Sequence, residues 1–419
     1  MRTFYTVLLY LLAPVVLLRL AWRGMRAPDY WRRWPERFGS VAPALGEQVI
    51  WVHAVSFGEV QAAEPVIRVL LDRYPDYSLL LTTVTPTGSA RVKVLFGDEV
   101  AHVYAPYDLP GAVKRFFGRV RPRLAIVMET ELWPNLFHRC QLHGVPLLLV
   151  NARLSARSVR GYQRVSGLVG ETLAAITEII AQSETDAGRF RQLGASPAAV
   201  SVSGNLKFEQ RIPPSLLERA EVLRRDWGVV RPVWIAASTH EGEDELILDV
   251  FSRLRTQFTD CLLVIAPRHP ERFESVAALC RQRGYHTVMR SEHADFSGAT
   301  DIYMGDTMGE LTLLYAAVDV AFVGGSLVAH GGHNLLEPAA LGIPVVTGPH
   351  MFNFQEITAL MVESGAAIKV VDTDALLQVL TRWLGDANER HRVGQLGKAV
   401  VEHNRGALQA VMAIIGRYL

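Results

Sequence analysis

Short, nearly continuous apolar runs alternate along this chain with longer segments whose apolar residues recur at helical spacing. Such runs are typical of strands buried on both faces of a parallel sheet that helices cover. A long arginine-bearing helix is expected after the fifth run. Seven strands are expected in the first half: QVIWVHAVS, YSLLLTTVTP, HVYAPYD, LAIVMET, VPLLLVNA, EIIAQS and VSVSGNLKF.

The same alternation begins again after QRIPPS (residues 210–215), where the adjacent Pro213 and Pro214 indicate a linker. A charged helix is expected from Glu243 onward. Seven further strands are expected: PVWIAAST, CLLVIAPRHPERF, YHTVMR, DIYMG, VDVAFVGGS, GIPVVTGP and AAIKVV.

Two successive strand–helix alternations predict an α/β fold of the GT-B type, in which two doubly wound Rossmann-like domains face a cleft. The expected parts are a membrane anchor over residues 1–22, a first domain over 23–210 and a second domain over 211–419. The last helix is a candidate to cross back to the first domain. Sheets of this kind bind ligands beyond the carboxyl ends of their strands, so the site is expected there.

The N-terminus differs from the rest. Residues 4–20, FYTVLLYLLAPVVLLRL, are almost entirely apolar and span about 26 Å as a helix, against roughly 30 Å for a hydrocarbon core. No small-x-small cleavage site follows, and arginines alternate with aromatic residues in WRGMRAPDYWRRWPERFG. The pattern predicts a retained anchor in the inner membrane with a cytoplasmic body. An ordinary buried helix is the alternative.

Composition narrows the class of protein. With 419 residues and 49% apolar residues, the chain can form two or three cores. A net charge of +1 argues against a nucleic-acid surface. Three widely spaced cysteines without a CxxC motif fit a reducing compartment and no disulfide framework.

Candidate chemistry begins with Glu59, which follows the first strand at the start of a helix. An ordinary glutamate pKa of about 4.3 would leave it ionised at neutral pH, as a general base requires. A partner of the helix dipole is the alternative role.

Further charged residues follow other strands. Glu129 and Glu131 follow LAIVM, and one of them is expected to cap the next helix. Lys207 follows a later strand and is a candidate cation, although a lone lysine is usually solvated.

In the second half, HGGHNLLEPAA (residues 330–340) lies between an apolar run and an expected helix. Gly331 and Gly332 are expected to leave backbone N–H groups free for an anion at the helix start. Glu337 would repel that anion but suits a ribose hydroxyl. Together these features predict a nucleotide site.

Two other segments extend this interpretation. Arg268 in APRHPER can make a forked contact to phosphate, with His269 as a possible helper or a structural residue. In GDTMGEL, Met308 and Gly309 are candidates to meet a base, whereas capping explains Glu310 equally well.

Several familiar signals are missing or weak. No GxGxxG follows the first strand and no GxxxxGK[ST] occurs, so neither a dinucleotide site nor a P-loop is predicted. His330 and His333 lack a third ligand, so no metal is expected. Asp372 and Asp374 precede a helical run, where capping is the preferred role.

The ordered set of motifs resembles one family, the 3-deoxy-D-manno-octulosonic acid (Kdo) transferases of lipopolysaccharide synthesis. The resemblance covers nearly the whole chain. It is carried by VSFGE, TTVTPTGS, YAPYDLP, METELWPN, NARLSARS, GNLKF, STHEGE, APRHPERF, GDTMGEL and FVGGSLVAHGGHNLLEPAALGIPVVTGPHMFNF.

The resemblance implies transfer of Kdo from CMP-Kdo to lipid IVA, the phosphorylated lipid A precursor, with inversion and without a metal or another cofactor. The family's general base falls on Glu59, and its transition-state residues fall on Glu129 and Lys207. Leu335 alone departs from the family's residue type. The implied CMP contacts are Pro267, Arg268, Met308, Gly309, Glu310, Asn334, Leu335, Leu336 and Glu337.

Arginine-rich stretches in the first half suggest how the anionic acceptor docks. Arg153, Arg157 and Arg160 are expected to help, with a solvated helix face as the alternative. Three other functions stay open: a transferase that uses a UDP-sugar and another membrane lipid, an epimerase of this fold, and a silent scaffold that binds nucleotide and membrane.

Overall fold

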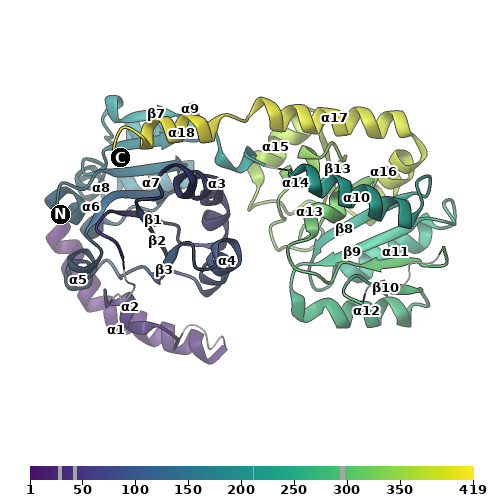
Figure 1. The fold of residues 1–419 in the computed structure, drawn as a ribbon, viewed down its shortest axis with the longest axis horizontal. Helices are drawn as coiled ribbons and strands as arrows, with labels where there is room; N and C mark the ends of the chain where they lie inside the picture. The colour runs from purple at the N-terminus through teal and green to yellow at the C-terminus, as the bar shows by residue number, and fades with distance from the viewer. Residues whose placement is uncertain (27–30, 41–44, 211, 293–297) are drawn as a thin grey trace. The chain divides into compact units, whose positions relative to one another are not determined.

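The computed structural model describes residues 1–26, 31–40, 45–210, 212–292 and 298–419 (Figure 1). The chain divides into two compact units. The N-terminal unit comprises Met1–Glu209 together with Arg405–Leu419, and the C-terminal unit comprises Gln210–Asn404. Each unit contains a seven-stranded parallel sheet, which confirms the predicted α/β class.

The sheet of the N-terminal unit has the order β3-β2-β1-β4-β5-β6-β7. This is the doubly wound order, in which the direction of crossover reverses between β1 and β4. All seven predicted strands are present. They are β1 (Val49–His53), β2 (Ser78–Thr83), β3 (Ala101–Tyr104), β4 (Pro122–Met128), β5 (Leu147–Ala152), β6 (Glu178–Ala181) and β7 (Val200–Val202).

The helices of this unit largely follow the predicted segments, but the prediction of one long helix after β5 is wrong. Two helices, α7 and α8, occupy that segment. The segment is broken at Val165, which has a non-helical backbone, between the poor helix formers Gly161 and Gly167. The elements are α1 (Arg2–Arg26), α2 (Trp34–Arg37), α3 (Phe57–Arg73), α4 (Pro86–Phe96), α5 (Pro110–Val120), α6 (Pro134–Leu142), α7 (Ala156–Gln163), α8 (Ser166–Leu173), α9 (Glu184–Gln192), the 3-10 turns η2 (Pro197–Ala199) and η3 (Leu206–Phe208), and α18 (Ala407–Ile415).

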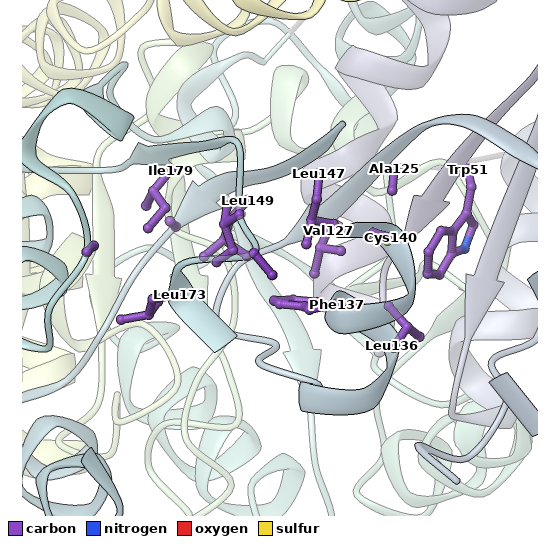
Figure 2. Packing of buried hydrophobic residues seen from close by; sticks show 14 of the residues in the cluster. Trp51, Ala125, Val127, Leu136, Phe137, Cys140, Leu147, Leu149, Leu173 and Ile179 are labelled. Carbon is purple, nitrogen blue, oxygen red and sulfur yellow. The ribbon is translucent and has the colours of Figure 1, made fainter. Parts of the chain in front are cut away.

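Two apolar layers cover the faces of this sheet. On one face, Trp51, Val127 and Leu149 pack with residues of α6 and α8 such as Phe137 and Leu173 (Figure 2). On the other face, α3, α4 and the C-terminal α18 contribute the buried side chains.

The C-terminal helix α18 is fixed where the chain returns to the N-terminal unit. The Glu209 carboxylate accepts the N–H groups of Gly406 and Leu408, at 2.8 and 3.1 Å. One carboxylate therefore binds the start of α18 next to the point where the chain leaves for the C-terminal unit.

The C-terminal unit repeats the design, with strand order β10-β11-β9-β8-β12-β13-β14 and a reversal between β8 and β12. Pro214, predicted as linker, is the first residue of α10. The strands are β8 (Val233–Thr239), β9 (Leu262–Pro267), β10 (Thr287–Met289), β11 (Ile302–Met304), β12 (Val320–Val323), β13 (Val345–Thr347) and β14 (Ala367–Lys369). The helices are α10 (Pro214–Trp227), α11 (Asp244–Leu254), η4 (Pro270–Arg272), α12 (Phe273–Gln282), α13 (Leu311–Ala316), α14 (Leu336–Ala340), α15 (Gln355–Glu363), α16 (Thr373–Gly385) and α17 (Ala387–His403).

Candidate active site

Part of the candidate site lies where the two sheets reverse their winding. Glu59 follows β1, and Glu129 and Glu131 follow β4, the strand hydrogen-bonded beside β1. In the C-terminal unit, Glu243 follows β8 and the glycine-rich loop follows β12, which also pair with each other. These reversal points are where doubly wound sheets bind ligands.

Glu59 is held by the cap of its own helix. The Ser56 hydroxyl caps α3 by accepting the Glu59 N–H at 3.4 Å. The Glu59 carboxylate accepts in return from the Ser56 hydroxyl at 3.0 Å and from the Val55 N–H at 2.8 Å. Glu59 thus takes part in the cap of its own helix, and these bonds fix the orientation of the carboxylate.

The environment of Glu59 changes its acidity. Burial, followed by the negative charge of Glu131, raises the pKa of Glu59 to about 8. The expectation of an ordinary pKa near 4.3 is therefore wrong, because the side chain is only 8% exposed. A carboxyl whose pKa lies near neutral pH is a stronger base when ionised than an ordinary glutamate.

Glu129 lies between two cations. Its Oε1 is 2.9 Å from Lys207 Nζ, and its Oε2 is 2.8 Å from Arg153 Nε. The backbone of Glu129 has a φ of 57°, a left-handed conformation that is uncommon for a residue with a Cβ. Such strain concentrates at functional sites.

Neither Glu129 nor Glu131 caps the following helix, so that prediction is wrong. Glu131 accepts the indole N–H of Trp133 at 2.7 Å, and burial raises its pKa. The N-terminus of α6 is capped instead by Asp108, which accepts the N–H groups of Asn135 and Leu136 at 3.0 and 2.7 Å. The cap therefore comes from the loop before α5, while the charge of Glu131 acts on Glu59.

Lys207 is positioned by a short turn. The Leu206 N–H donates to Asn151 Oδ1, and the Lys207 N–H donates to Asn205 Oδ1, both at 3.0 Å. Leu206 and Phe208 are buried on either side. Lys207 therefore belongs to the same cluster as Glu129.

In the C-terminal unit, a residue that the sequence did not single out organises the loop after β12. Glu243 is fully buried. Its carboxylate accepts the backbone N–H groups of Gly325, Ser326 and Leu327 at 2.6, 3.0 and 2.9 Å, and that of His240 at 3.2 Å. The motif STHEGE contains this residue, but nothing local indicates its partners.

The expected anion site at the glycine turn is therefore partly wrong. Glu243 takes the N–H groups after β12, and the Gly332 N–H donates to Gly325 O at 2.9 Å. Helix α14 is only five residues long, and Asn334 Oδ1 accepts its Leu336 N–H at 3.1 Å. Gly332 nevertheless has a φ of 71°, a left-handed conformation that favours glycine.

Histidines surround the same loop. The His240 ring stacks on His330, with centroids 4.1 Å apart, and its Nε2 is 2.9 Å from His333 Nε2. Burial, then the neighbouring His330, lowers the pKa of His240 to about 4. Burial and then Arg268 lower the pKa of His333 to about 3. Both lowered pKa values favour neutral rings at pH 7, which leaves Arg268 as the cation beside them, because its neighbour Arg272 pairs with Asp244.

Arg268 directly follows β9, whose last residue, Pro267, is buried. The backbone N–H of Arg268 donates to Thr239 O at 3.0 Å. This contact joins the ends of β8 and β9, so Arg268 and the histidines gather at one edge of the sheet.

Glu310 makes no cap, although it occupies the N-cap position of α13. It pairs with Arg219 at 2.6 Å and with Arg290 at 3.0 Å, and it accepts the Thr307 hydroxyl at 2.7 Å. The hydrogen bond from Arg290 is the main reason why the pKa of Glu310 falls to about 2. Beside it, Met308 is 64% exposed, and Gly309 has a φ of 86°.

The remaining candidates lie at the start of α14. Asn334 donates to Glu337 Oε1 at 3.1 Å, while the side chains of Leu335 and Leu336 are fully buried. A ligand could therefore meet these leucines only through their backbone.

Of the two acidic residues expected to cap α16, Asp372 does so and Asp374 does not. Asp372 caps α16 by accepting the Ala375 N–H at 2.9 Å, as predicted, and Asp374 pairs with Arg253 at 2.6 Å. Among the residues that the structure describes, no group of three or more potential ligands is arranged to hold a metal ion.

Comparisons with known proteins address the whole chain. Residues 32–210 match the family described as 3-deoxy-D-manno-octulosonic-acid transferase (kdotransferase), and residues 237–400 match glycosyl transferases group 1. The chain is 43% identical over 421 residues to the 3-deoxy-D-manno-octulosonic acid transferase of Haemophilus influenzae, covering 100% of this chain and 99% of that protein. It is 37% identical over 431 residues to the protein of the same name from Bordetella pertussis, with 100% and 99% coverage.

Solved structures with the same architecture include the UDP-GlcNAc 2-epimerase of Neisseria meningitidis bound to UDP-GlcNAc. It has a TM-score of 0.58 at 13% identity and covers 88% of this chain and 100% of that chain. Anabaena HepE in complex with UDP has a TM-score of 0.56 at 13% identity, with 89% and 100% coverage. At such low identity these likenesses show the fold alone.

The paired doubly wound units and the match to glycosyl transferases group 1 define a glycosyltransferase of the GT-B fold. Within that class, the chain belongs to the 3-deoxy-D-manno-octulosonic acid (Kdo) transferase family, because it is 43% identical to a member along its full length.

Proposed function

We propose that this protein transfers Kdo from CMP-Kdo to lipid IVA with inversion at the anomeric carbon, and that Glu59 is the general base. The observation that carries the proposal is the buried Glu59 carboxyl at the reversal point between β1 and β4, with Glu131 beside it and a pKa of about 8. Family membership supplies the transferred sugar and indicates its nucleotide.

The proposed reaction is a direct displacement. A sugar hydroxyl of the acceptor forms a bond to the anomeric carbon of Kdo, while its proton passes to the Glu59 carboxylate. The bond between that carbon and the phosphate oxygen breaks, and its electron pair leaves on CMP. Fixing the carboxylate through Val55 and Ser56 would hold the base in position for this transfer.

The cluster of Glu129, Lys207 and Arg153 supports a role in stabilising the transition state. It contains one carboxylate and two cations, so it carries a net positive charge. Kdo has a carboxylate of its own, which ordinary hexoses lack. We assign Lys207 to this carboxylate and Glu129 to the orientation of the lysine.

We assign nucleotide binding to the C-terminal unit and acceptor binding to the N-terminal unit. Arg268 is the proposed phosphate contact, in a setting where the nearby histidines are neutral donors. The exposed Met308 side chain and Gly309 are proposed to meet the base, with Glu310 fixing their loop. Other proposed contacts are Pro267, Asn334, Glu337 and the backbone of Leu335 and Leu336.

We propose that the acceptor lies in the inner membrane and that the body of the protein lies on its cytoplasmic face. Helix α1 contains a segment, Arg2–Leu20, that is long and apolar enough for a membrane, with a mean hydropathy of 1.9. Arg157 and Arg160 are exposed on α7 and remain candidates to bind the acceptor phosphates. Arg153 is a weaker candidate because it pairs with Glu129.

The test is a mass spectrum of lipid IVA after incubation with the purified protein and CMP-Kdo. A gain of one or more Kdo residues is expected, and the number gained gives the valency. No gain, with active donor and acceptor confirmed by a characterised Kdo transferase, would contradict the proposal.

Competition by free nucleotides distinguishes the proposed reaction from the main alternative, a transferase that uses a UDP-sugar. CMP is expected to compete with the donor, and UDP is not. Competition by UDP alone would favour a UDP-sugar transferase or an epimerase, and binding without turnover of any donor would favour a scaffold.

A further inference from the structure

Helix α1 has two faces that differ along its whole length. Phe4, Leu11, Leu18 and Met25 lie on one face and are 65 to 73% exposed. The opposite face is buried or half-buried against the N-terminal unit. Its positions are 5, 9, 13, 17, 20 and 24, at the three- and four-residue spacing of one helical face.

The first turn of α1 is bound to the folded unit. The Tyr5 hydroxyl donates to Asp108 Oδ2 at 3.0 Å, and the Thr6 hydroxyl donates to Asn135 Oδ1 at 3.1 Å. Asp108 is the residue that caps α6, so these bonds reach the buried start of that helix.

The last turn of α1 is also close to the unit. Gly24 is buried, and a Cβ on it would lie within 1.8 Å of the Trp31 ring. Just beyond Trp31, Arg33 donates to His102 O at 2.6 Å, and Glu36 accepts the Tyr104 N–H at 2.7 Å, both at the edge strand β3. Figure 1 shows α1 in purple running past α5 and α2 along the N-terminal unit.

These contacts are incompatible with a helix that crosses a bilayer. A spanning helix places its two ends on opposite sides of a hydrocarbon core of about 30 Å, and its middle faces lipid. Here the middle positions 9, 13 and 17 form a half-buried stripe, the first turn is hydrogen-bonded to the unit, and the last turn lies against Trp31 of the same unit.

We infer that α1 lies in the plane of the membrane surface, with its exposed face from Phe4 to Met25 inserted among the lipids. The inference rests on the membrane attachment proposed above and goes further by assigning its geometry. A helix in the plane of the membrane buries its apolar face about 5–10 Å into the boundary between headgroups and acyl chains.

The charges beside α1 match an anionic lipid surface. Gly111 of α5 lies against the Tyr10 hydroxyl of α1. Residues 110–123 include five exposed basic residues and no acidic residue: Lys114, Arg115, Arg119, Arg121 and Arg123. Anionic headgroups attract such a cluster.

Spin-label depth measurements test the geometry. Phe4→Cys, Leu11→Cys and Leu18→Cys each place a label on the exposed face of the full-length protein, bound to vesicles of phosphatidylethanolamine and phosphatidylglycerol. The in-plane helix predicts equal, shallow depths for the three labels. A spanning helix predicts successive depths that differ by about 10 Å, because seven helical residues rise that far.

Ala13→Cys is the matched control on the face that contacts protein. In the in-plane geometry its label is shielded from oxygen dissolved in the lipid, whereas the Leu11 label is not. Equal lipid access at both positions, or a deepest label at Leu11, would overturn the inference. The three native cysteines are buried, so wild-type protein treated with the same label should carry little of it and sets the background.

Kdo transfer in detergent keeps the two proposals distinguishable. Each variant is expected to retain transfer, because the labelled side chains lie outside the proposed site. Loss of vesicle binding by an active enzyme would contradict membrane attachment together with its geometry. A shallow, uniform helix on a protein without transfer activity would support the geometry and contradict the proposed function.

Discussion

Two buried glutamates occupy comparable positions in the two units and have different surroundings. Glu59 follows β1 and Glu243 follows β8, each beside the point where its sheet reverses winding. Glu59 accepts one backbone N–H and one hydroxyl, whereas Glu243 accepts four backbone N–H groups. Glu131 lies near Glu59 and raises its pKa further.

The difference shows how the surroundings of a buried carboxylate decide how fully its lost hydration is replaced. Four backbone N–H groups replace the water that Glu243 loses on burial, so this side chain has a structural role in holding the loop after β12. Glu59 has fewer donors and lies near a second carboxyl, and its pKa is raised to about 8. Residue type and burial alone do not distinguish the two.

The largest expected effect is on turnover after Glu59→Gln. Removing the base should lower kcat by at least about 100-fold, since general-base help contributes roughly 10² to 10⁴. CMP affinity, measured by calorimetry, should be unchanged. Glu64→Gln on the same helix is the matched control and should retain full turnover. Normal turnover in Glu59→Gln would remove this residue from the role of base.

Glu243→Ala should act on stability instead. Four backbone N–H groups would lose a charged acceptor, which should cost about 2–4 kcal/mol of unfolding free energy. Differential scanning calorimetry should show a lower transition temperature for the C-terminal unit. Glu241→Ala, at an exposed position two residues away, should melt like the wild type. An unchanged transition in Glu243→Ala would show that the loop does not depend on this carboxylate.

A pH profile tests the electrostatic side of the comparison. The base acts only when ionised, so kcat/KM should rise with pH through about 8, the pKa of Glu59. Because this pKa is raised above the unfolded value, ionisation also disfavours the folded state. The stabilising contribution is full below about pH 4.3 and is lost as pH rises through about 8.

Glu131→Gln sharpens the same experiment. It removes a negative charge that raises the pKa of Glu59, so the rise in kcat/KM should move to lower pH. Glu64→Gln should leave the profile in place. A profile that does not move in Glu131→Gln would show that burial alone sets the acidity of Glu59.

Much of the fold follows from local patterns. Continuous apolar runs such as those around Trp51 and Phe322 predict their strands, because a parallel sheet buries both faces. The position of Glu59 was equally predictable, since the carboxyl ends of parallel strands meet at one edge. The break between α7 and α8 was not predicted, although the poor helix formers Gly161 and Gly167 lie on either side of it.

The missed site features depend on partners that are distant in sequence. Glu243 binds N–H groups more than 80 residues away, and Asp108 caps α6 across 27 residues. The pKa of Glu59 depends on burial and on Glu131, which follows a different strand. No local spacing contains this information.

The smallest effects should come from the cations on Glu129. Lys207 is 20% exposed and Arg153 is 46% exposed, so water can replace Arg153 more easily. Lys207→Ala should weaken donor affinity by about tenfold, the equivalent of one charged hydrogen bond, and Arg153→Ala should weaken it less. Titration of CMP-Kdo into each variant, with CMP as the control ligand, measures both. Because CMP lacks the Kdo carboxylate, its affinity should not change. A larger loss in Arg153→Ala, or an equal loss for CMP, would mean that Lys207 does not bind that carboxylate.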